Sequence, residues 1–149
     1  MQVLVVQAGA VASIVNHLNA SPRSCSCQTK GAEPARCYCA CSKSATARLL
    51  GRLCSDQVAQ MQLVHHNPVE ALLQMLTGGC KSIVLYHDLE GNELQPRCEK
   101  SRVLMESAAE YALLKIACHC DEEFREHMLN ACIGQVWMGH DIPVALMLL

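Results

Sequence analysis

One apolar stripe, present more than once, constrains the fold of this chain more than any other feature. From Asn67 to Leu76, the residues Val69, Leu72, Leu73 and Leu76 recur at the i, i+3, i+4, i+7 spacing of a helix buried along one side. Proline follows Asn67 and pushes it out of the helical region. The stretch therefore predicts an amphipathic helix that begins at a corner.

The same stripe lies 58 residues earlier in the chain, in Val11, Ile14, Val15 and Leu18. A second set of matches lies at an offset of 63 residues and pairs Ser44 with Ser107, Leu50 with Leu113, Leu53 with Ile116, Met61 with Phe124, and Asn67 with Asn130. Removal of an insert of roughly 20 residues leaves a period of about 42, which is typical of armadillo and HEAT repeats. The chain is therefore expected to repeat one helical unit.

The composition favours closely packed helices. Hydrophobic residues make up 51% of the chain and aromatic residues only 3%, so the core must be built from thin side chains. The net charge of -2 gives no dominant basic surface for nucleic acid. No apolar run approaches the roughly 20 residues that cross a membrane. We expect one all-α domain over 1–149, with no nucleic-acid partner and no membrane span.

The cysteine content indicates a reducing compartment. Eleven cysteines, an odd number, argue against the paired framework of a secreted scaffold. The apolar N-terminus, Met1 to Val15, lacks the basic segment of a signal peptide. We therefore predict a cytoplasmic location.

Two segments interrupt the helical pattern. Residues 22–43 lack apolar periodicity and predict a flexible, cysteine-rich insert, after which Ser42 or Ser44 would cap the next helix. Residues 78–100 predict a second insert, in which 83–87 reads equally as a short strand or a helical turn.

The remaining helices follow from apolar spacing and caps. One helix carries Leu49, Leu50 and Leu53, and Asp56 caps the next, with its apolar residues Val58, Met61 and Val64. Later helices are expected over 101–118, with burial from Val103 to Ile116, and over 122–129. A third, degraded copy of the stripe helix would begin at a corner at Asn130, weakened by Gly134 and Gly139 and broken by Pro143.

These features together resemble the armadillo repeat family. Residues 7–18 are similar to the family's glycine turn and third helix, and 44–56 and 108–118 to its Ala- and Leu-rich second helix. Neither corner after those helices keeps the family's usual Asn, so the asparagine ladder of importin-type members is not expected. A cysteine-rich insert in a small armadillo array is also similar to polarity adaptors of the Inscuteable type, although no diagnostic motif accompanies that likeness.

The resemblance implies a short right-handed α-solenoid of about two to two-and-a-half repeats with two loop inserts. Its expected function is that of a non-catalytic scaffold or adaptor that binds a protein or peptide along a helical groove. About three repeats are needed for a stable stack, so the chain would belong to a longer array or self-associate. The residues expected to contact a partner are Asn67, Glu70, Gln74, Arg48 and Arg52.

A metal- or redox-responsive protein is the alternative. Soft thiolates bind zinc or copper(I), and the candidate ligands are Cys25, Cys27, Cys37, Cys39 and Cys41. Free or acylated thiols explain the same pattern. A second ligand group would combine Cys118, His119, Cys120 and Asp121 with His127 and Cys132, although cysteines at such positions also pack as small apolar residues.

No pattern in the sequence predicts an enzyme. His65 and His66 lie near Glu70, but no recognisable nucleophile accompanies them. Residues 78–82 lack the spaced first glycine of a phosphate loop. We therefore expect no catalytic residues and no resident cofactor.

Overall fold

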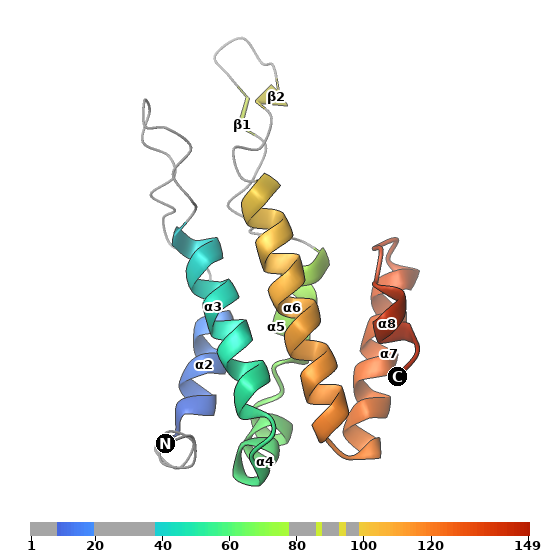
Figure 1. Cartoon of the computed structure of the whole chain (residues 1–149). Coiled ribbons are helices and arrows are strands. Elements are labelled where there is room, and N and C mark those ends of the chain that lie inside the picture. The colour runs from blue at the N-terminus through green and yellow to red at the C-terminus, as the bar shows by residue number, and fades with distance from the viewer. Residues whose placement is uncertain (1–8, 20–37, 78–85, 88–92, 95–98) are drawn as a thin grey trace.

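The computed structural model describes residues 9–19, 38–77, 86–87, 93–94 and 99–149. Helices packed against one another make up this part of the chain (Figure 1), which confirms the predicted all-α class. In chain order they are α2 (Ala10–Asn19), α3 (Tyr38–Leu53), α4 (Gln57–His66), α5 (Val69–Thr77), α6 (Glu99–His119), α7 (Glu122–Trp137) and α8 (Val144–Met147). The strands β1 (Tyr86–His87) and β2 (Glu93–Leu94) pair antiparallel, so the end of 83–87 is a strand.

Two helix pairs stand side by side and form the body of the fold. In Figure 1, α3 and α6 run next to each other in the same direction, with α2 behind α3 and α5 behind α6. The short α4 packs against α2, and α7 packs against α5 and α6. One outer face of the molecule therefore belongs to α3 and α6, and the opposite face to α2 and α5.

Both predicted stripes are buried. The four stripe residues of α5 and the four of α2 belong to one core, with Leu113 and Ile116 of α6. Glu70 and Gln74 are the exposed residues of α5. Burying each Val or Leu contributes about 1.5–3 kcal/mol to folding, so the stripes are a main source of stability.

Local hydrogen bonds fix the corners between helices. The carboxylate of Asp56 accepts from the backbone N–H of Ala59 at 3.0 Å and begins α4. Asn67 ends α4 with a left-handed φ of 40°, and its side-chain oxygen accepts from the N–H of Val69 at 3.3 Å. The predicted cap at Asp56 and the predicted corner before α5 are both confirmed.

The helix after the first insert begins earlier than predicted. α3 starts at Tyr38, so the last residues of the predicted insert, 38–43, are helical. Neither Ser42 nor Ser44 caps α3, because both lie inside the helix. Oγ of Ser42 lies 2.8 Å from Nε2 of His17 and links α3 to α2. α6 likewise starts at Glu99, two residues inside the predicted second insert. The rest of 22–43 lies outside the described residues.

The predicted third copy of the stripe helix is wrong. α7 is one helix from Glu122 to Trp137, and Asn130 lies exposed in its middle. Asn67 is followed by Pro68, but Asn130 is followed by Ala131. No proline therefore interrupts the helical hydrogen bonds of α7 at this position. A single glycine, Gly134, is tolerated within a helix at modest cost.

Several residues expected on apolar faces are exposed instead. These are Leu49, Val58, Met61, Val64 and Val103. The buried positions on α4 are Ala59 and Leu63, and α6 also buries Met105. Apolar residues occur on all sides of α4 and α6, so their spacing does not select one buried side. Among the described helices, none is long and apolar enough to cross a membrane.

Candidate partner-binding surfaces

α3 and α6 make a close contact at Gly51. A Cβ added to Gly51 would lie 2.8 Å from Cε1 of Tyr111 and 3.3 Å from Cα of Ala112. Real side chains essentially never approach so closely, so the contact requires glycine unless the neighbours move. It fixes the register of the two parallel helices. Arg48 and Arg52 lie on the turns around Gly51, and Lys115 lies one turn after Tyr111.

Three exposed basic residues lie on the two helices around this contact. We name this surface the α3–α6 face and define it by Arg48, Leu49, Arg52, Tyr111 and Lys115. The two arginines and the lysine are exposed, and Nζ of Lys115 lies 5.9 Å from the centre of the Tyr111 ring, within cation–π range. The sequence of α3 contains no acidic residue. This face therefore offers positive charge beside an aromatic ring and the partly exposed Leu49.

The sequence identified only part of the α3–α6 face. Arg48 and Arg52 were predicted to contact a partner, and the structure puts both on this surface. Lys115 was missed, and Tyr111 was expected to be buried although it is half-exposed. The i, i+4 spacing of Tyr111 and Lys115 was the available signal. Lys43 is also a basic residue of α3, but it is not included in this face. Its Nζ donates to the carbonyl oxygen of Leu18 on α2 at 3.1 Å.

The other predicted partner residues lie on a different surface. Glu70 and Gln74 are exposed one turn apart on α5, which belongs to the opposite layer in Figure 1. Asn67 has a structural contact, since its Nδ2 lies 3.0 Å from Nε2 of His127 on α7. The predicted set is thus divided between two faces of the molecule.

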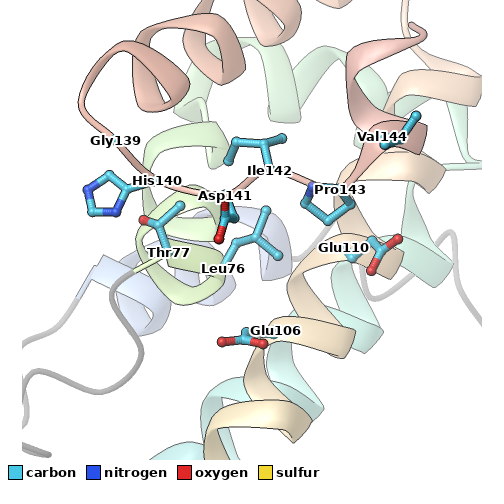
Figure 2. A pocket seen from close by; sticks show the side chains of 10 residues that line it. All are labelled: Leu76, Thr77, Glu106, Glu110, Gly139, His140, Asp141, Ile142, Pro143 and Val144. Atoms are coloured by element: carbon cyan, nitrogen blue, oxygen red, sulfur yellow. The ribbon is translucent and has the colours of Figure 1, made fainter.

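A groove missed by the sequence lies between the end of α5, the middle of α6 and the segment that joins α7 to α8. Figure 2 shows the side chains around this space, whose volume is about 600 Å³. We name it the C-terminal groove and define it by its lining residues, which are Leu76, Thr77, Glu106, Glu110, Gly139, His140, Asp141, Ile142, Pro143 and Val144. Gly139 turns the chain out of α7 with a φ of +87°.

The lining of the C-terminal groove mixes acidic and apolar side chains. Glu106 and Glu110 stand on successive turns of α6, and Asp141 lies on the segment that crosses between them and α5 (Figure 2). Leu76 and Ile142 supply apolar surface. Among the ten described lining residues, none is Lys or Arg. The groove therefore combines negatively charged and apolar surface.

The proposed thiolate site of 25–41 remains a prediction. Cys25, Cys27 and Cys37 lie outside the described residues, while the backbone at Cys39 and Cys41 belongs to the first turns of α3. In the part of the chain that the structure describes, no three His, Cys, Asp or Glu residues are grouped to hold a metal ion. The second ligand group, around Cys118–Asp121, is therefore not assembled.

Burial suppresses the reactivity of the core thiols. Burial raises the pKa of Cys54 to about 11, against the partial opposing effects of a hydrogen bond from its own backbone and of Lys115. Its Sγ donates to the carbonyl oxygen of Gly51 at 2.8 Å. Burial also raises the pKa of Cys120 to about 11, with a further rise from Cys54 and Asp121. Because the thiolate is the nucleophile and the metal ligand, these cysteines serve as core residues.

The two histidines considered for catalysis lie at the exposed end of α4. The rings of His65 and His66 contact each other edge to face, with centres 4.8 Å apart. Glu70 follows on the exposed side of α5. The phosphate-loop-like residues 78–82 lie outside the described part of the chain, and α5 ends just before them at Thr77.

Comparisons with known proteins assign no family to this chain. No protein-family model matches it, and no curated protein or solved structure matches it at a significant level. The resemblance to armadillo repeats thus remains an interpretation of the sequence.

Proposed function

We propose that this chain is a non-catalytic protein-interaction module that binds an acidic segment of a partner protein across the α3–α6 face. The observation that carries this proposal is the exposure of Arg48, Arg52 and Lys115 on two helices that touch at Gly51 and Tyr111, with Lys115 near the Tyr111 ring. Arginine and tyrosine are enriched among the residues that dominate interface energies. Complementary charge also accelerates the encounter with an acidic partner.

The rigidity of the supporting helices favours the same function. The contact of Gly51 with Tyr111 and Ala112 holds α3 against α6, and buried Leu50 and Leu113 pack beneath the face. A preorganised surface loses less conformational entropy on binding than a flexible one. The α3–α6 face is therefore suited to recognise one extended segment.

The proposal extends to the architecture and the compartment. Two helix pairs in the same arrangement (Figure 1) are compatible with a short armadillo-like solenoid, in which α3 and α6 would line the binding groove. A cytoplasmic module would keep its thiols reduced, and the described Cys54, Cys118, Cys120 and Cys132 are free.

The test compares partner binding by three forms of the chain. Wild type is used as bait in a cell extract beside the variant Arg48→Glu/Arg52→Glu/Lys115→Glu. The control Gln57→Glu/Met61→Glu/Val64→Glu places three new acidic residues on exposed positions of α4. Both variants gain negative charge, although the first changes the net charge by twice as much, so binding is also measured at several salt concentrations.

The expected result is one acidic protein that wild type and control retain and the α3–α6 variant loses. With that protein purified, the α3–α6 variant should bind at least about tenfold more weakly than the control, since three exposed charge pairs are removed and reversed. Equal binding by both variants at physiological salt would contradict the proposal.

A further inference from the structure

Three exposed glutamates lie on the first turns of α7, directly after its cap residue Asp121. They are Glu122, Glu123 and Glu126, and we name them the α7 acidic surface. Residues three and four positions apart are neighbours on the surface of a helix. Glu126 therefore lies beside both Glu122 and Glu123, and the three carboxyl groups share one side of α7.

Arg125 lies among these glutamates in the sequence, but its guanidinium is held against the end of α6. Its Nε donates to the carbonyl oxygen of Ala117 at 3.0 Å, and its Nη2 donates to that of Cys120 at 3.4 Å. Within the described part of the chain, no lysine or arginine forms an ion pair with any of the three glutamates. The described fold therefore leaves the negative charge of the α7 acidic surface unpaired.

The α3–α6 face has the complementary charge at the same spacing. Arg48 and Arg52 are exposed four residues apart on α3, as Glu122 and Glu126 are on α7. Four residues of an α-helix span about 6 Å along its axis, so two helices laid side by side can pair both arginines with both glutamates. Lys115 supplies a third positive charge from the neighbouring α6.

One copy of the chain does not bring these two surfaces together. In Figure 1, α7 stands on the side of α6 that faces away from α3. The helix contacts of α7 are with α5, α6 and α8. A contact between the α3–α6 face and the α7 acidic surface therefore requires two molecules.

We propose that the α3–α6 face of one copy binds the α7 acidic surface of a second copy. This inference rests on the proposed function, whose site it uses, and it names an acidic partner for that site. Charge complementarity argues for this occupant, because every copy carries both surfaces and the described fold pairs neither with the other. Complementary charge steers such an encounter. Exposed ion pairs are individually weak, so the association is reversible and sensitive to salt.

Sedimentation velocity of the reduced, full chain tests the proposal. At an ionic strength of about 0.05 M, the average mass of wild type should rise with protein concentration, and at about 0.5 M it should return toward that of one copy. Glu122→Gln/Glu126→Gln should weaken the association at least about fivefold. Glu70→Gln/Asp141→Asn, at exposed positions and with the same change in net charge, should leave it within about twofold.

Exchange of the charges between the two surfaces locates the contact. Arg48→Glu/Arg52→Glu and Glu122→Arg/Glu126→Arg should each abolish the association, because like charges then face each other. The chain with all four substitutions has the net charge of wild type and should recover the association within about threefold. Circular dichroism verifies that each variant keeps its helices.

Three results would overturn the proposal. These are a wild type that stays a single copy at low ionic strength, equal losses in the two carboxyl variants, and no recovery in the chain with all four substitutions. A wild type that stays a single copy but still retains an acidic protein through the α3–α6 face would overturn this inference alone and leave the proposed function standing.

Discussion

A methyl group on Gly51 would lie 2.8 Å from Cε1 of Tyr111. This contact between α3 and α6 holds together two helices that are far apart in the sequence and that carry the exposed Arg48, Arg52 and Lys115. It also explains why a glycine lies inside α3, where it costs about 0.5–1 kcal/mol relative to alanine. The close approach of the helices offsets that cost.

Replacing Gly51 by valine is expected to destabilise the fold by about 1–3 kcal/mol, because the added atoms meet Tyr111 and the backbone of Ala112. Gly134→Ala is the matched control, since a Cβ there has no neighbour within 4 Å. It should stabilise the helix by about 0.5–1 kcal/mol. Urea unfolding followed by circular dichroism measures both changes. A Gly51→Val variant as stable as wild type would show that the helices are not held at this distance.

The corner at Asn67 is expected to require a residue that tolerates the left-handed conformation. Asn67→Ala should cost about 1–2 kcal/mol, because its φ is 40° and alanine is strained there. Asn67→Gly keeps the backbone but loses the contact with His127 and should cost less than Asn67→Ala. The melting temperatures of both variants show whether the left-handed backbone or the contact with His127 contributes more to stability. If glycine were the more destabilising, the side-chain contact would outweigh the backbone conformation.

The buried thiols should make the fold sensitive to alkali. An unfolded thiol titrates near 9.0, whereas the pKa values of Cys54 and Cys120 are raised to about 11. From about pH 9 to 11 the unfolded chain loses protons that the native chain keeps, so stability is fully present below that range and falls as pH rises through it. Each thiol contributes up to about 1.4 kcal/mol per pH unit.

Reduced protein unfolded in urea at several pH values between neutrality and about 11 measures this slope. Burial also raises the pKa of Cys132, so Cys54→Ala removes one of three such thiols and should flatten the fall in the free energy of unfolding, whatever its effect at neutral pH. The same slope in wild type and variant would mean that Cys54 is not protected from ionisation by the fold.

Cysteine labelling should follow exposure. Cys118 is exposed, whereas Cys54, Cys120 and Cys132 are buried. Brief treatment of the native, reduced chain with iodoacetamide should therefore modify Cys118 well before the other three, because buried thiols are inert. Peptide mass spectrometry reports each position. Labelling of Cys54 as fast as Cys118 would indicate that α3 and α6 separate readily.

The sequence allowed the core stripes to be predicted but not the surfaces. Val11–Leu18 and Val69–Leu76 are flanked by polar residues at helical spacing, so their buried side was unambiguous. The length of α7 was missed because Asn130 repeats Asn67 without the proline that makes the corner. The C-terminal groove brings Leu76 together with Asp141, and no local pattern connects residues so far apart. Lys115 was missed for the same reason, since only the packing of α3 on α6 joins it to Arg48.

Site-specific cross-linking at Leu49 tests the central claim most directly. Leu49 lies between Arg48 and Arg52 and is 44% exposed, so a photoreactive benzoylphenylalanine there should leave the core intact. The control position is Met61 on α4, which is 71% exposed. In cells that express the intact chain, we expect irradiation to join position 49 to an acidic segment of one protein and position 61 to no part of it. Adducts that are the same at both positions, or no adduct at position 49 with any protein, would contradict the account.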